Sequence, residues 1–182
     1  MKKLMLALVL ACAGLAAGAA AQENPMVGGA AMLRTKNIVE NAVNSRDHTT
    51  LVAAVRAAGL VETLAGPGPF TVFAPTNAAF EKLPAGTVEA LLRSENKALL
   101  TKVLTYHVVA GKVDARKLAE EIRKGGGTAT LKTVSGGTLK AMMSGDAIVI
   151  RDEKGGSATV TIGDVRQSNG VIHVVDTVLM PR

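Results

Sequence analysis

The sequence predicts an α+β domain, with helices in the first half of the chain and strands in the second. Apolar residues recur at helical spacing as far as Lys124, whereas after Gly127 they alternate with polar residues, as in half-buried strands. The aromatic residues are a third indication, because all three Phe residues and the single Tyr fall between residues 70 and 106. We therefore expect one aromatic packing centre. The chain shows no internal repeat, which predicts a single copy of the domain.

The helical half begins with two amphipathic helices, one near residues 38–43 and one that runs from the expected N-cap Asp47 to Gly59. Alternating Gly and Pro at residues 66–69 then break the chain, so a buried strand is expected at residues 70–74. Thr76 can cap a short helical turn after that strand. Further helices are expected at residues 87–93, 95–105 and 114–124, the last of them capped by Asp114.

The strand-rich half is punctuated by turns that contain Gly together with Ser, Asp or Lys. These turns separate short segments in which apolar and polar residues alternate, which is the pattern of strands in an antiparallel sheet. The strands are expected at residues 128–134, 138–142, 147–151, 158–162 and 171–175.

The N-terminus has the pattern of a secretory signal peptide over residues 1–21, with Lys2 and Lys3 before an apolar stretch and small residues before Gln22. Residues 22–33 are expected to be a flexible linker, and the domain is expected to span residues 34–182. Cys12, the only cysteine, would need cleavage after an unusually short apolar segment to accept a lipid, so we do not expect lipoprotein anchoring. The mature chain then lacks disulfides, thiol nucleophiles and thiolate metal sites.

Composition narrows the classes of partner. Removal of residues 1–21 lowers the formal charge from +6 to +4, which favours loose attraction to anionic polysaccharide, lipid or nucleic acid. The basic residues are scattered, Trp is absent and the aromatic residues are expected to be buried, so a stacking surface for nucleic acid is missing. We expect no specific nucleic-acid partner. No segment after the signal peptide is long and apolar enough to span a membrane.

Three separate segments carry a recognisable pattern: residues 70–84, residues 104–111 and residues 169–181. In this order they resemble the motifs of a fasciclin domain, and the resemblance extends over residues 34–182. It implies a compact β-sheet wedge with packed N-terminal and central helices, in which the terminal strand pairs near the first-motif strand. It also implies that the motif residues are fold-supporting: Phe70, Phe73, Pro75, Phe80, Tyr106, His107, Asn169, Gly170 and His173.

Two histidines in these motifs allow a sharper hypothesis, a metal or acid/base site shared by His107 and His173. Each lies in an apolar, strand-like run, where a neutral, hydrogen-bonded core histidine is the commoner arrangement. A metal site also needs a third ligand, and His48 belongs to the distant N-terminal helical region. We therefore interpret both residues as structural and expect no metal, cofactor or catalytic residue.

The contact region is the least constrained part of the prediction. Asp164 and Val165 lie where some animal fasciclin domains carry an integrin-binding motif, although only the acidic and aliphatic pair matches here. We list them as candidate partner-binding residues, with a turn cap at Asp164 as the alternative. The resemblance implies an exported, monomeric, non-enzymatic adhesion module, periplasmic or extracellular, for a cell-surface or matrix protein or polysaccharide. The alternative is a periplasmic carrier or sensor of a small apolar ligand, lined by Met142, Met143 and Met180.

Overall fold

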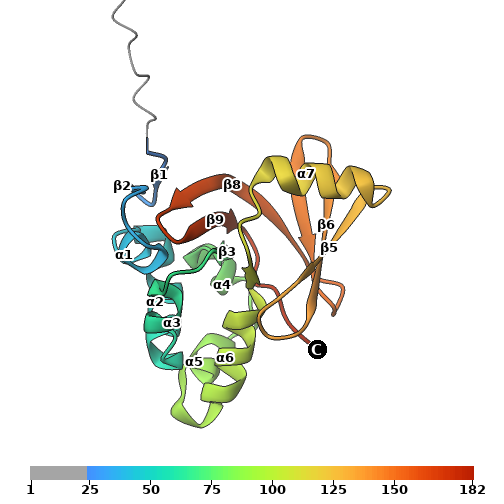
Figure 1. Cartoon of the computed structure of the whole chain (residues 1–182). Helices are drawn as coiled ribbons and strands as arrows, with labels where there is room; N and C mark the ends of the chain where they lie inside the picture. The colour runs from blue at the N-terminus through green and yellow to red at the C-terminus, as the bar shows by residue number, and fades with distance from the viewer. Residues whose placement is uncertain (1–23) are drawn as a thin grey trace, which may run out of the picture.

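The structure is a computed structural model that describes residues 24–182, and it confirms the α+β prediction (Figure 1). Helices α1 to α6 gather on one side of the sheet, and α7 covers the strands at the other end. The helices are α1 (Ile38–Ala42), α2 (Thr49–Ala58), α3 (Val61–Ala65), α4 (Asn77–Glu81), α5 (Thr87–Leu92), α6 (Lys97–Tyr106) and α7 (Ala115–Lys124), with 3-10 turns η1 (Arg46–His48) and η2 (Ser94–Asn96). The strands are β1 (Met26–Val27), β2 (Ala30–Ala31), β3 (Phe70–Pro75), β4 (Val108–Ala110), β5 (Thr128–Lys132), β6 (Thr138–Ser144), β7 (Ala147–Arg151), β8 (Ser157–Gln167) and β9 (Gly170–Val175).

The main sheet has seven strands in the order β4-β3-β9-β8-β7-β6-β5 and is nearly closed. Its one parallel pair is β3 with β9, in a register that sets Phe70 opposite Gly170 and Pro75 opposite Val175. The two ends of the sheet meet beyond β5, where a bridge pairs Val109 with Thr133 and the Val134 N–H donates to the Val108 carbonyl at 2.8 Å. Closure leaves few unpaired strand edges.

Two apolar cores lie on opposite faces of β3 and β9. Val72 and Ile172 point toward α1 to α6, whereas Phe73 and Val175 point toward α7 and strands β5 to β8. Because successive side chains of a strand alternate between faces, a strand with a core on each face is buried along its length. All six residues of β9 are buried, which explains why the sequence of this strand is almost continuously apolar.

The segment expected to be a flexible linker, residues 22–33, contains the β1–β2 hairpin within its described part. Val27 and Met32 are buried there at 4% and 2% exposure and belong to the core of the helical half. The packed structure therefore begins before the expected boundary at residue 34. The expected signal peptide, residues 1–21, and Cys12 lie outside the described residues. Within residues 24–182, no helix combines the length and apolarity that a membrane crossing requires.

The N-termini of three helices test the caps that the sequence predicts. Thr76 and Asp114 cap α4 and α7 as predicted, with side chains that accept from Ala79 N–H and Lys117 N–H. Asp47 is not the cap of α2, because it lies inside η1. The side-chain oxygen of Asn77 instead accepts from Thr50 N–H at 3.0 Å, a cap supplied from a different part of the chain.

Candidate functional site

The three sequence motifs meet at the centre of the sheet. The first forms β3 and the last forms β9, and these two strands are parallel neighbours. The central motif ends α6 and continues into β4, which pairs with β3 on its other side, Phe70 opposite Ala110. Segments that are far apart in the sequence thus form three adjacent strands.

Asn169 connects these strands to the N-terminal helices. Its side-chain nitrogen donates to the carbonyls of Leu64 and Gly66 at 2.7 and 2.8 Å, and its side-chain oxygen accepts from Ile38 N–H at 3.0 Å. Gly170, the next residue, approaches β3 so closely that a Cβ would lie 2.0 Å from the carbonyl oxygen of Phe70. Neither residue uses the positive φ that the Asn-Gly dipeptide suggests. Asn169 is needed here for its side-chain hydrogen bonds, and Gly170 for the close approach of β9 to β3.

His107 is held between two backbone groups. Its Nδ1 lies 2.8 Å from the Val103 carbonyl, and its Nε2 accepts from Leu179 N–H at 2.9 Å, so the hydrogen of the neutral ring is on Nδ1. The residue caps the end of α6 and is 2% exposed. Burial lowers the pKa of His107 to about 4, against the opposing effect of the Val103 carbonyl.

His173 has the opposite tautomer. Its Nε2 lies 2.8 Å from the Val113 carbonyl, to which it donates, and its Nδ1 accepts a long bond of 3.4 Å from Asp164 N–H. The ring stacks on Phe73 with 5.6 Å between the centroids. Burial lowers the pKa of His173. Both nitrogens of each motif histidine are thus engaged with backbone groups, and among residues 24–182 no cluster of three or more metal-ligating side chains is present.

Tyr106 joins the lobe that contains α1 to α6 to a second lobe, which α7 and strands β5 to β8 form. The side chain is 0% exposed, and its hydroxyl donates to the Thr138 carbonyl at 2.7 Å and accepts from Glu153 N–H at 3.1 Å. Its ring lies against Gly137, where a Cβ would come within 2.8 Å of it. Phe80, which is buried, and Phe70, which is half-buried, belong to the core of the helical half, and the buried Pro75 ends β3.

The predicted contact pair requires a correction. Val165 is 0% exposed and part of the core, so it cannot contact a partner. Asp164 lies in an irregular part of β8 with φ of +56°, and its carboxylate accepts from Ala115 N–H at 2.6 Å, at the start of α7. The segment is a strand with a bulge rather than an open loop.

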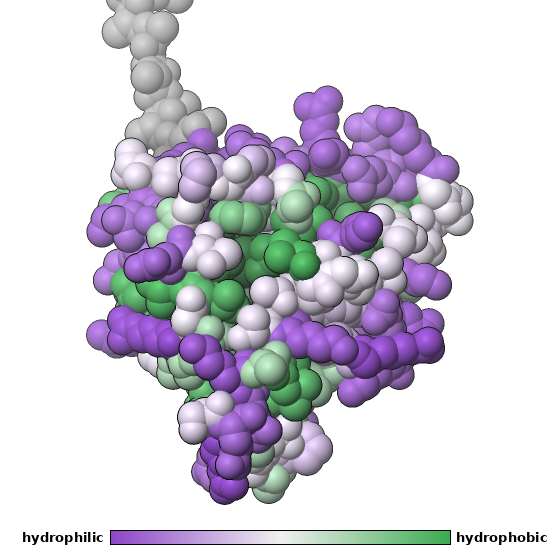
Figure 2. Space-filling model, turned by 60° about the horizontal axis from the view of Figure 1, so that its bottom comes forward, coloured by the Kyte–Doolittle hydropathy of each residue, from purple (hydrophilic) through white to green (hydrophobic). Residues whose placement is uncertain are grey.

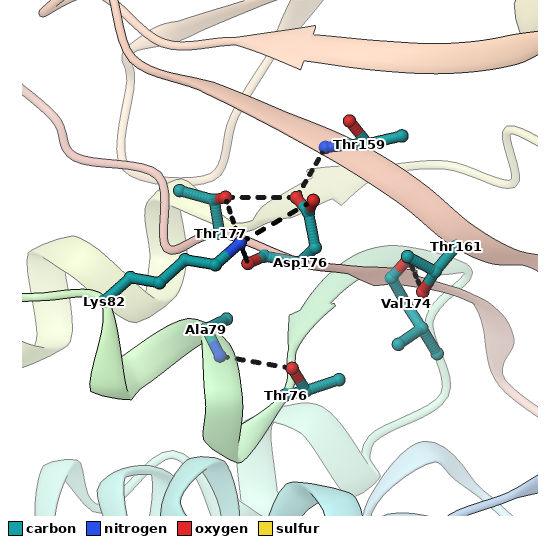
Figure 3. Close-up of polar contacts among 8 residues, drawn as sticks. All are labelled: Thr76, Ala79, Lys82, Thr159, Thr161, Val174, Asp176 and Thr177. Carbon is teal, nitrogen blue, oxygen red and sulfur yellow. Dashed lines mark hydrogen bonds and ion pairs between the residues drawn. The ribbon is translucent and has the colours of Figure 1, made fainter.

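A second carboxylate that bonds to the backbone lies just after β9, at the half-buried Asp176 (Figure 3). Its oxygens accept from Thr159 N–H at 2.8 Å and from the Thr177 hydroxyl at 3.0 Å, and the Lys82 ammonium lies 3.7 Å away. Burial alone would raise the pKa of Asp176, but these bonds and the Lys82 charge outweigh it and lower the pKa. Asp176 therefore ties α4, β8 and β9 together, and sequence patterns gave no sign of it.

Comparison with known proteins places these features in a family. The Fasciclin domain model matches residues 46–181. Protein sll1483 of Synechocystis sp. is 47% identical over 161 residues, which cover 88% of this chain and 82% of that protein. Cell surface glycolipoprotein MPB83 of Mycobacterium bovis is 34% identical over 167 residues, covering 89% of this chain and 68% of that protein.

A solved structure supports the fold alone. The FAS1 domain pair from the insect cell adhesion molecule fasciclin I matches with a TM-score of 0.71 at 17% identity, covering 80% of this chain and 51% of that one. The match to the Fasciclin domain model and the identity to the sequence relatives also show the family. The chain therefore belongs to the fasciclin family.

Proposed function

We propose that this protein is an exported, non-catalytic adhesion module that binds a protein or polysaccharide at the cell surface or in the matrix. The observation that carries the proposal is the inward orientation of the motif side chains. His107, His173 and Asn169 use their hydrogen-bonding atoms on backbone groups of the domain itself. Recognition is then left to the outer surface, in keeping with a relative that is named a cell surface glycolipoprotein.

The outer face of β5 to β7 is the surface we assign to this contact. It holds a polar hollow of about 750 Å³ lined by, among others, Thr128, Thr130, Lys140 and Arg151. Lys140 and Arg151 are exposed and directly opposite each other on β6 and β7, and within the described chain neither forms an ion pair. Like charges opposite each other are unfavourable in a sheet, so a bound partner with acceptor oxygens would relieve them.

The carboxylates at the edge of this hollow already accept hydrogen bonds from groups of the domain itself. Asp152 accepts from the N–H groups of Gly156 and Met180, and Glu153 accepts from Thr138. These bonds fix the rim of the hollow, while the hydroxyls of Thr128 and Thr130 and the cations of Lys140 and Arg151 remain available. Such an arrangement suits the hydroxyl and carboxylate oxygens of a polysaccharide better than an apolar protein surface.

The test is attachment of the producing cells and of host-type cells to the immobilised protein, with a heat-unfolded sample as control. We expect attachment that needs the folded protein and that falls in a Lys140→Thr/Arg151→Thr variant. A Lys132→Thr/Lys154→Thr variant removes the same charge from exposed positions of the same lobe outside the hollow and should attach normally. No attachment of either cell type would refute the adhesion function; equal loss in both variants would refute this surface.

A further inference from the structure

An apolar cavity lies inside the helical half, away from the surface assigned to adhesion. It is enclosed between helices α1 to α3 and the β3–β9 pair, has a volume of about 50 Å³ and is lined by Ile38, Ala42, Leu51, Val55, Ile172 and Val174 together with other apolar residues. None of Met142, Met143 and Met180 is in its wall, so the sequence-based location of a ligand pocket is corrected. We propose that this cavity binds a small uncharged amphiphile whose oxygen accepts a hydrogen bond from His48.

His48 is the polar group that would orient a ligand bound in the cavity. Its side chain is 3% exposed and lines the cavity, and its Nε2 has no hydrogen-bond partner. Most buried polar groups in proteins are paired, and leaving one unpaired is costly. An unpaired nitrogen in a mostly apolar wall therefore marks the place where a ligand's polar atom would be stabilised.

The neighbours of the ring decide which kind of polar atom fits. The Ser45 hydroxyl lies 2.9 Å from Nδ1, and the Ala74 carbonyl faces the ring without meeting hydrogen-bond geometry. A serine hydroxyl that donates to Nδ1 leaves the ring hydrogen on Nε2. The complementary ligand atom is an acceptor, as in an alcohol, a ketone or an ester.

The size of the cavity and the polarity of its lining argue against a lone water molecule or a charged ligand as the occupant. The cavity exceeds the roughly 10–15 Å³ that a water needs, but a buried water is usually held by two to four polar partners, and most of the residues that line this cavity are apolar. A charged ligand group buried beside Nε2 would lose its hydration, because Arg56, the charged residue in the cavity lining, is itself exposed to solvent. An aliphatic chain with one oxygen satisfies both the apolar wall and Nε2.

Access to the cavity is through its outer wall. Val39, Val52 and Val61 line it and are only half-buried, so the side formed by α1 to α3 is thin. Figure 2 shows hydrophobic surface gathered in a band on the side of the molecule where these helices lie, between hydrophilic side chains. A ligand longer than the cavity would extend along this band.

The test uses 1-butanol and n-pentane, which have similar shapes and differ in the oxygen. NMR titration of the intact protein should give saturable shifts of the Ile172 and Val174 methyl groups with both ligands, and of the His48 ring nitrogens with butanol. Butanol should bind about 2- to 10-fold more tightly, the gain expected for one hydrogen bond. In His48→Phe this preference should disappear.

A matched pair of variants tests the location. Ala42→Leu fills the cavity from α1 and should abolish both titrations, whereas Ala57→Leu, the same change at an exposed position of α2, should leave them unaltered. If Ala42→Leu fails to fold, the comparison of butanol with pentane in the unaltered protein still tests whether the cavity binds the ligand. Non-saturable shifts, or a butanol preference that survives in His48→Phe, would overturn the proposal. Cell attachment is read separately, so either function can fail alone.

Discussion

The side-chain oxygen of Asn169 accepts a hydrogen bond of 3.0 Å from the backbone N–H of Ile38, a residue 131 positions earlier in the chain. The same side chain holds the carbonyls of Leu64 and Gly66. One amide group thus fixes the start of α1 and the end of α3 against the turn between β8 and β9. An amide suits this position because it offers two donors and an acceptor at once.

Replacement of Asn169 should destabilise the domain strongly. Asn169→Ala leaves two carbonyls and one N–H unpaired in a buried place, and we expect a loss of about 3 kcal/mol in the free energy of unfolding. Urea unfolding measures this directly. Asn44→Ala, which removes one exposed bond to the Glu40 carbonyl, is the control and should change stability by less than about 1 kcal/mol. Equal effects of the two changes would contradict the role we give to Asn169.

Tyr106→Phe should weaken the connection between the two lobes. The change keeps the ring but removes the hydroxyl that contacts the Thr138 carbonyl and the Glu153 N–H. We expect a loss of about 1–3 kcal/mol, with faster hydrogen exchange at the Glu153 amide. Unaltered exchange at this amide would show that the hydroxyl does not hold the β7–β8 turn in place.

Stability should fall in mild acid. Burial lowers the folded-state pKa of His107 from 6.5 to about 4 and also lowers the pKa of His48 and His173. A histidine with a lowered folded pKa contributes its full stability above the unfolded pKa and loses it as the pH falls toward the folded one. His107 alone should lose about 3 kcal/mol between pH 7 and pH 4. Urea titrations across this range should show a shallower decline for His107→Gln.

Asp164→Ala should lower the stability of the domain. The carboxylate bonds to the first turn of α7, and the backbone has a left-handed conformation that Asp and Asn tolerate better than Ala. We expect Asp164→Ala to lose about 1–2 kcal/mol. Asp164→Asn keeps an acceptor oxygen and the backbone preference, so its melting temperature should stay close to that of the unaltered protein. Unchanged melting in the Ala variant would instead favour a contact role.

The sequence was most informative where a signal is local. The caps Thr76 and Asp114 and the strands at β3, β7 and β9 follow from residue type and alternation. It failed where the pattern is interrupted. The register of β8 shifts between Ile162 and Val165, so the alternation of apolar and polar residues is broken after Ile162 although the strand continues to Gln167. The burial of Val165 follows from this continuation.

The polar groups of the site show the same division. Apolar surroundings correctly suggested that His107 and His173 face inward, but nothing local indicates that Asn169 reaches Leu64 or that Asn77 caps α2. These bonds depend on elements brought together by the fold. His48 is distant in sequence from the other histidines, yet it lines the cavity beside β3, as does His107. A polar residue between apolar helix faces was the available signal.

The position of β9 also determines when the protein can fold. This strand comes last in the sequence but lies between β3 and β8, so neither of those ladders exists until residues 170–175 are present. During synthesis from the N-terminus, the helical half has no completed sheet to pack against. The sheet of the nascent chain can therefore close only after residues 170–175 have been made, and a chain truncated before residue 170 would expose two strand edges to proteases and to aggregation.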